Sequence, residues 1–395
     1  MLSIALAPLT TVLSGIGIAS ILYSASILAV LRVPWLERHA VYMHRLKLTG
    51  GKDLNHPEQF GFAHRQTTPF FIETKDGMRL HTWHVLPIGL YYKNAARLSM
   101  QARLTDEPFS GTLNFQLLKD DPEARLVIHT HGSSGAMSAY CRTDCYRSLS
   151  SIAPDKIHVL AFDYRGFGLS SGTPSEEGLM IDAQSVFRWA VEIASIAPER
   201  IVVFGQSMGS SVAIALVREL ALQKVSVAGL IITASFPDVP TVLSEYRTIF
   251  GLRALGPLAK FPRLKELFSR GMCNEWPNLD RLVDIVRHSP VYHIEIFHAQ
   301  DDPVVPWSLS NMFFENAVRA ASDVDLDEAG FKKEKIRKLV DMEEGGWKVE
   351  WPTPRGLIRQ EVPQYGVHDR IMMQPQIAMA VMRAFQNKDS NFERA

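Results

Sequence analysis

Apolar and polar positions divide the chain into an uncharged N-terminal stretch and a body in which short apolar runs alternate with helical segments. Residues 1–31 contain no Asp, Glu, Lys or Arg, and the first charged side chain is Arg32. A helix over residues 9–31 would be about 34 Å long, enough to cross the roughly 30 Å apolar core of a bilayer. A cleavable signal peptide needs a basic N-terminal region and a shorter apolar run. The pattern therefore predicts a single-pass membrane anchor rather than a signal peptide or a buried core helix.

The residues after this stretch bear on the orientation of the body. Two aromatic and four basic side chains could form an interfacial belt: Trp35, Tyr42, Arg32, Arg38, Arg45 and Lys47. The positive-inside rule applied to the basic ones favours a cytosolic body, and no Asn-x-Ser/Thr glycosylation acceptor argues for a lumenal one. A single anchor with an uncharged N-terminus gives the rule little to act on, so the side of the membrane stays open. We expect residues 1–48 to form the anchor and juxtamembrane segment.

The body, residues 49–395, shows the alternation of an α/β protein. Apolar runs suited to buried strands occur at residues 126–130, 157–162, 201–204, 227–233, 292–297 and 357–362. Helix-length segments lie between and after them, including residues 176–195, 208–222 and 374–386. A hairpin is predicted at residues 70–86, where Asp76-Gly77 supplies the turn. The sequence therefore predicts a mostly parallel central sheet with helices on both faces, and two insertions at about 88–122 and 321–354.

Composition narrows the class further. The 395 residues are 46% hydrophobic and 21% charged, typical of a globular chain long enough for one large core. Lys+Arg and Asp+Glu both number 42, so nothing in the net charge favours nucleic acid as a partner. Three cysteines cannot all pair within the chain. The fold must therefore be stabilised by packing rather than by a disulfide framework.

Two G-x-S-x-G sequences compete for the position of a serine nucleophile. Ser207, in residues 205–209, directly follows an apolar strand and precedes a helix that starts with small residues, which is the context of a nucleophile elbow. Ser170, in residues 168–172, lies well past the end of its strand in a Gly-rich loop closed by Pro174. We predict that Ser207 is the nucleophile, that Ser170 is loop structure, and that Gly205 and Gly209 are required because side chains there would collide with the strand or the helix.

A serine hydroxyl needs a base and a group that orients the base. On such an elbow the order along the chain is Ser, acid, His, and after Asp302 only one histidine remains, His368. Asp301 and Asp302 both follow the strand at 292–297, at the edge of the sheet where α/β proteins keep their sites. We favour Asp302 as the acid because of its place in Asp-Pro-Val-Val-Pro, and Asp301 as a carboxylate that caps the loop.

Chemistry on an acyl group also requires donors for an oxyanion. The glycines of His131-Gly132-Ser133-Ser134-Gly135, which follows the strand at 126–130, let backbone N–H groups approach a ligand. We predict that the N–H groups of Ser133 and Met208 form the oxyanion hole.

Several of these motifs together resemble the α/β-hydrolase superfamily, over about residues 70–385 outside the two insertions. The segments His131-Gly132, Asp163-Tyr164-Arg165-Gly166-Phe167-Gly168, residues 205–209 and residues 298–306 are similar to those of the membrane-anchored lysophosphatidylserine and monoacylglycerol lipases of the abhydrolase family. The resemblance implies an integral enzyme of the endoplasmic reticulum that cleaves single-chain lipids with the triad Ser207, Asp302 and His368, without a metal or other cofactor. The insertions and Ser133-Ser134 depart from the family pattern, so pocket shape and substrate do not carry over.

A basic segment bears on the substrate. Residues 247–270 hold six basic side chains and one acid, Glu266, between two predicted strands, where hydrolases of this class often carry a lid. With its interleaved apolar residues, a helical lid at about 236–290 could lie on an anionic membrane or receive an anionic headgroup through Arg253, Lys260 and Arg263. A solvated basic helix face is an equally good interpretation.

The sequence thus favours a membrane-anchored serine hydrolase that cleaves carboxylic esters of single-chain lipids, with the lipid and the membrane as its partners. A protein thioesterase or peptidase on the same fold, and a non-catalytic membrane scaffold, are the alternatives. Headgroup, chain length and oligomeric state have no signature in the sequence.

Overall fold

A single mixed sheet organises the molecule. The computed structural model describes residues 33–101, 108–245, 272–322 and 327–389, together with residues 18, 22, 26 and 392. Within them the sheet has ten strands in the order β1-β2-β4-β3-β5-β6-β7-β10-β9-β8. Their bounds are β1 (Thr67–Glu73), β2 (Arg79–Val85), β3 (Arg125–Thr130), β4 (Ile157–Phe162), β5 (Ile201–Gln206), β6 (Gly229–Thr233), β7 (Tyr292–Phe297), β8 (Leu339–Asp341), β9 (Gly346–Thr353) and β10 (Gly356–Pro363).

The middle of this sheet is parallel and its two ends are antiparallel. The run β4-β3-β5-β6-β7-β10 is parallel throughout. The predicted hairpin at one end is confirmed: β1 pairs antiparallel with β2, and Gly77 in its turn has φ +81°. At the other end, residues of the expected second insertion form β9 and β8, which extend the sheet antiparallel beyond β10. The carboxyl ends of the parallel strands therefore meet along one edge.

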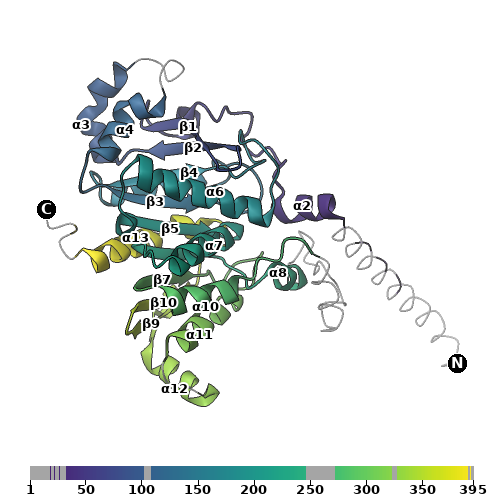
Figure 1. Cartoon of the computed structure of the whole chain (residues 1–395). Coiled ribbons are helices and arrows are strands. Elements are labelled where there is room, and N and C mark those ends of the chain that lie inside the picture. Colours follow the sequence, from purple (N-terminus) through teal and green to yellow (C-terminus); the bar gives the residue numbers. More distant parts are fainter. Residues whose placement is uncertain are drawn as a thin grey trace.

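Helices cover both faces of the sheet (Figure 1). They are α2 (Pro34–Tyr42), α3 (Ile88–Ser99), α4 (Leu113–Lys119), α5 (Arg142–Ile152), α6 (Glu176–Arg188), α7 (Met208–Leu222), α8 (Val239–Glu245), α10 (Asn278–His288), α11 (Leu309–Ala321), α12 (Glu328–Lys338) and α13 (Pro375–Lys388). Short helical turns lie at Pro57–Phe60, Phe109–Gly111, Trp189–Ile193, Pro198–Arg200, Glu343–Gly345 and Arg370–Met373.

Alternate residues of each central strand enter two separate cores. On β3, Leu126 and Ile128 pack in the cluster that holds the apolar faces of α6, α7, α10 and α11. Val127 between them packs in the cluster formed with α5 and α13. Successive side chains of a strand point to opposite faces, so a strand covered on both sides is buried throughout and is mostly apolar. The exceptions are buried polar side chains such as His129, His158 and Glu295.

The structure describes the two ends of the predicted lid at about 236–290, and each end contains a helix. Its N-terminal part contains α8, and its C-terminal part contains α10, which packs against α7 and α11 as a layer of the fold. Residues 246–271, with Arg253, Lys260 and Arg263, lie outside the described residues.

The predicted anchor also lies outside the described residues, except for positions 18, 22 and 26. In the part of the chain that the structure covers, no helix has the length and apolar character needed to cross a bilayer. Helix α2 follows at once and is packed on the hydrolase body: Tyr42 and Glu37 are fully buried in it.

Candidate active site

Ser207 lies in a strained turn between β5 and α7. Its backbone has φ 54° and ψ −124°, and its N–H donates to the carbonyl of Thr233 on the neighbouring strand β6. A Cβ on Gly205 would lie 2.5 Å from the carbonyl oxygen of Gly209, and a Cβ on Gly209 would lie 2.0 Å from that of Thr130. Both contacts are too short for any side chain, so the two glycines are needed for helix and strands to approach this closely.

His368 connects the hydroxyl of Ser207 to the carboxylate of Asp302. The Nε2 atom of His368 lies 3.0 Å from Oγ of Ser207, and its Nδ1 atom lies 2.8 Å from Oδ2 of Asp302. The three side chains come from loops after β5, β7 and β10, at the carboxyl edge of the parallel strands. Three residues that are far apart in the sequence are therefore linked by two consecutive hydrogen bonds.

Asp302 is held more firmly than its neighbour. Its Oδ1 accepts the N–H groups of Val304 and Val305, and its Oδ2 also lies 3.1 Å from Nε2 of the buried His298. Asp301 instead accepts the N–H of Val367 through Oδ1, at 2.8 Å. The structure thus gives the two adjacent carboxylates different partners, with only Asp302 on the imidazole.

The electrostatics of the pair follow from these contacts. Burial acts to raise the pKa of Asp302, but the hydrogen bonds from His298 and His368 outweigh it and hold that pKa well below its usual range. Burial acts to lower the pKa of His368, and the hydrogen bond to Asp302 outweighs it, so the pKa of His368 lies above its usual 6.5. Asp302 thereby favours a proton on the imidazole, which a base that takes a proton from Ser207 requires.

The loop that follows β3 also lies against Ser207. A Cβ on Gly132 would lie 3.3 Å from Cβ of Ser207, which places the loop directly against the nucleophile. Among the described residues, the N–H groups of Ser133 and Met208 have no hydrogen-bond acceptor, whereas the N–H of Ser134 donates to the carbonyl of Tyr42. The two predicted oxyanion donors are therefore available to a ligand, and Ser134 is not.

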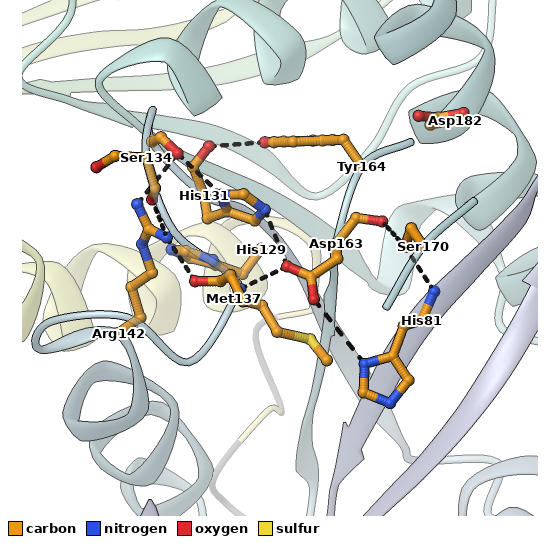
Figure 2. A network of polar contacts seen from close by, with 12 residues as sticks. His81, His129, His131, Ser134, Met137, Arg142, Asp163, Tyr164, Ser170 and Asp182 are labelled. Atoms are coloured by element: carbon orange, nitrogen blue, oxygen red, sulfur yellow. Dashed lines mark hydrogen bonds and ion pairs between the residues drawn. The ribbon is translucent and has the colours of Figure 1, made fainter. Parts of the chain in front are cut away.

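Ser170, in the second G-x-S-x-G sequence, is part of a loop-bracing network (Figure 2). Its Oγ donates to the carbonyl of Asp163 at 2.7 Å and accepts the N–H of His81 at 2.8 Å. The side chain is committed to backbone groups on both sides, in keeping with a structural role.

The Ser207 hydroxyl opens into a mostly apolar cavity of about 390 Å³. Its walls come from α2 and the residues after it, the loops after β3, β5, β6, β7 and β10, and α8: Ala40, Val41, Met43, Leu46, Gly132, Ser133, Ser134, Tyr140, Gln206, Ser207, Met208, Phe236, Val239, Val242, Leu243, Val304, Val305, His368 and Asp369. A volume of this order suits a small organic ligand, with few polar groups to fix its orientation. In the ranges that the structure describes, no group of three or more His, Cys, Asp or Glu side chains could hold a metal ion.

Sequence reasoning misses several residues that support this site. His298 could have been found from its place four residues before Asp302, on the turn where the strand ends. Gln206 donates through Nε2 to the carbonyl of His368, at 3.2 Å, and sits in the motif itself. Glu37 carries no sequence signal, because its partners Cys273 and Asn274 lie 236 and 237 positions away. Arg142 donates to carbonyls of the loop that directly precedes its own helix, a contact that no spacing rule marks.

Comparisons with known proteins bear on the family and the fold of the chain. The sequence profile of the alpha/beta hydrolase family matches residues 126–330. A lysophosphatidylserine lipase, ABHD12 of Danio rerio, is 26% identical over 297 residues, which cover 73% of this chain and 68% of that protein. The ABHD12 of Macaca fascicularis is 26% identical over 316 residues, 77% of this chain and 69% of its own. The esterase Pf2001 of Pyrococcus furiosus shares the fold, with a TM-score of 0.50 at 16% identity over 87% of this chain and 96% of its own. The chain belongs to the alpha/beta hydrolase family, and it is a serine hydrolase.

Proposed function

We propose that the protein cleaves the carboxylic esters of single-chain lipids, as a lysophospholipid or monoacylglycerol lipase. The observation that carries the proposal is the Ser207–His368–Asp302 chain of hydrogen bonds opening into an apolar cavity with two unengaged N–H groups beside it. The relatives named as lysophosphatidylserine lipases support the lipid class.

The first half of the reaction forms an acyl-enzyme. His368 Nε2 takes the proton of Ser207 Oγ while Oγ attacks the ester carbonyl carbon. The carbonyl oxygen becomes an oxyanion bound by the N–H groups of Ser133 and Met208. The bond to the alcohol then breaks, and His368 returns the proton to the departing alcohol oxygen.

Water completes the cycle. His368 takes a proton from a water molecule, whose oxygen attacks the acyl-enzyme carbonyl. Collapse of the second oxyanion releases the fatty acid and restores the proton to Ser207. Asp302 keeps its negative charge throughout and stabilises the imidazolium that forms in each half, consistent with its low pKa.

The proposal is tested by labelling the full chain with a fluorophosphonate probe and by measuring release of fatty acid from lysophosphatidylserine and monoacylglycerol. Ser207→Ala is expected to abolish both labelling and hydrolysis, whereas Ser170→Ala keeps labelling because its hydroxyl serves a loop. Labelling that survives Ser207→Ala would disprove the nucleophile. Competition by S-acylated peptides but not by lipid esters would identify a thioesterase instead.

We also propose that the chain divides into a membrane anchor and juxtamembrane segment at 1–48 and a hydrolase domain at 49–395, with a lid at about 236–290. An anchored enzyme would act at the membrane of the endoplasmic reticulum, where its substrate partitions into the bilayer. Retention of the full chain in membranes after carbonate extraction is the expected result, and release into the soluble fraction would contradict it.

The headgroup preference is proposed to depend on Arg253, Lys260 and Arg263. Replacing the three with Glu should lower hydrolysis of lysophosphatidylserine relative to monoacylglycerol, because the reversed charges repel an anionic headgroup. An unchanged ratio of the two rates would remove these residues from substrate selection.

A further inference from the structure

Arg142, the first residue of α5, is a buried cation that lies against the oxyanion loop. Its exposed fraction is 1%. Its guanidinium donates to four consecutive or nearly consecutive backbone carbonyls: those of Gly132 (3.1 Å), Ser133 (3.0 Å), Ser134 (3.0 Å) and Ala136 (2.6 Å). Figure 2 shows the side chain reaching into the turn that these residues form.

These contacts require the planar guanidinium of an arginine. Among the described residues, no Asp or Glu forms an ion pair with its guanidinium. A buried cation is costly unless its donors are satisfied, and here backbone carbonyls satisfy them. Lysine could not replace it, because a single ammonium has three donors and cannot span two pairs of oxygens as a planar fork does.

A buried anion contacts the same loop on both sides of the segment that Arg142 holds. Asp163 accepts the N–H of Met137 at 2.6 Å, and it lies 3.5 Å from His131 and 3.9 Å from His81 (Figure 2). Burial acts to raise the pKa of Asp163, but its contacts with His131 and His81 outweigh this, so its pKa lies below the usual range. The loop is therefore fixed by a positive group on its carbonyls and a negative group on an N–H.

The direction of the Ser133 N–H follows from the carbonyl that Arg142 holds. In a planar trans peptide, the C=O of one residue and the N–H of the next point in opposite directions. The Gly132 oxygen faces the guanidinium and also lies 2.8 Å from Nδ1 of His131. The Ser133 N–H of the same peptide unit must then point away from Arg142, and both residues line the cavity that contains Ser207.

We propose that Arg142 is the positioning residue of the oxyanion hole. It turns the peptide between Gly132 and Ser133 so that the N–H faces the reacting carbonyl, and its charge favours the oxyanion on the far side of that peptide. This inference rests on the proposed function and adds to it a residue that does not touch substrate.

The test compares Arg142→Met with Arg147→Met in the full chain. Arg147 lies on the same helix but donates to the carbonyl of Phe60 and to the carboxylate of Asp144, not to the carbonyls at 132–136. Each variant is assayed for kcat and KM with a soluble short-chain ester and for inhibition by an alkyl trifluoromethyl ketone, which places an oxyanion in the hole. Arg142→Met should lower kcat by about 10²-fold, the loss expected for one oxyanion donor, and weaken the ketone by a similar factor with KM little changed. Arg147→Met should leave both unchanged.

Two further measurements keep the inference open to refutation. Arg142→Lys retains the charge but not the fork, and should lie between the wild type and Arg142→Met; millimolar guanidinium should restore part of the kcat of Arg142→Ala and none of that of Ser207→Ala. A folded Arg142→Met with wild-type kcat and ketone affinity would overturn the proposal. Failure of both Arg142→Met and Arg142→Lys to fold would also overturn it, because the residue would then serve folding alone.

The proposed function and the positioning role of Arg142 can be disproved separately. Fluorophosphonate labelling that requires Ser207 but does not change when Arg142 is substituted would support the serine hydrolase and disprove only the positioning role. Labelling that does not depend on Ser207 would remove both.

Discussion

Ser207 and Ser133 follow neighbouring parallel strands, β5 and β3, yet the protein positions them by different means. Ser207 is fixed by local sterics: Gly205 and Gly209, two residues away on either side, let helix and strands close around it. Ser133 is fixed by contacts with two helices outside its own loop. Its hydroxyl donates to the carbonyl of Val41 on α2, and its own carbonyl accepts from Arg142.

The difference separates what a motif can encode from what only the tertiary fold provides. The steric requirement at Ser207 involves five consecutive residues, so it can be recognised from the spacing of glycines and serine. A loop held by contacts with α2 and α5 shows no such pattern in its own sequence. Substitutions on the nucleophile side of the site, around Ser207, should therefore act through the chemistry or the close packing of the substituted residue. Substitutions on the oxyanion side, around Ser133, should act by changing how α2 and α5 hold the loop.

The largest effect is expected at Asp302. Asp302→Asn should lower kcat by about 10⁴-fold, because the amide cannot stabilise the imidazolium and favours the wrong tautomer of His368. Asp301→Asn is the matched control, since Asp301 accepts only the N–H of Val367 at this site and should cost little activity. Steady-state kinetics on a soluble ester measure both. Equal losses in the two variants would mean that the acid has been assigned to the wrong carboxylate.

The steric basis of the elbow is tested next at Gly209. Gly209→Ala should destabilise the protein by about 1–3 kcal/mol and reduce fluorophosphonate labelling, because its Cβ meets the Thr130 carbonyl at the heart of the site. Gly345→Ala is the comparison: its Cβ would lie 3.3 Å from Cβ of Met342, a tight contact but much longer than the 2.0 Å at Gly209, and its backbone conformation is ordinary. Denaturant unfolding gives the free energies. A Gly209→Ala variant as stable and as reactive as the wild type would show that α7 can move away from β3 at no cost.

The sequence predicts the nucleophile side well. β4, β7 and α7 occur at the predicted residues, and the structure joins Ser207, Asp302 and His368 as the chain order requires. These features depend on strand ends and spacing, which a single sequence contains. The strands of the second expected insertion were not predicted, because β9 pairs antiparallel with β10 and β8 with β9, and such pairing depends on the partner strand rather than on the segment itself.

The oxyanion side could be predicted only in part. Ser133 follows from its strand and glycines, but the bracing by Arg142 joins a helix to a loop through carbonyl groups that every residue possesses. The contact of Ser133 with Val41 spans 92 positions, and that of Glu37 with Asn274 spans 237. No periodicity or motif marks such pairs, so the place of α2 in the wall of the cavity at Ser207, and the burial of Tyr42, could not be predicted.

A smaller effect is expected where α2 is clamped. The buried carboxylate of Glu37 accepts the backbone N–H groups of Cys273 and Asn274 and the side-chain amide of Asn274. Glu37→Gln keeps one acceptor oxygen and turns a donor toward the other N–H, which should cost about 1–2 kcal/mol of stability and raise KM as the wall of the cavity loosens. Arg38→Gln, on the same helix, is the control. Thermal unfolding measures the stability of both variants, and steady-state kinetics measure their KM. Equal stability and equal KM in Glu37→Gln and Arg38→Gln would mean that α2 is not held by this contact.

The smallest effect is a displacement of the pH profile. His368 must be neutral to accept the proton of Ser207, so kcat/KM should rise with pH through the pKa of His368 and level off above it. Because that pKa lies above 6.5, the midpoint of the limb should lie above pH 6.5. The carboxylate of Asp369 adds to the upward shift, so Asp369→Asn should move the midpoint to lower pH without abolishing turnover. Asp301→Asn should leave it in place. Profiles measured with a non-ionising ester test the sign: a midpoint that moves up in Asp369→Asn, or that lies below pH 6.5 in the wild type, would contradict an imidazole whose proton is stabilised by the carboxylates around it.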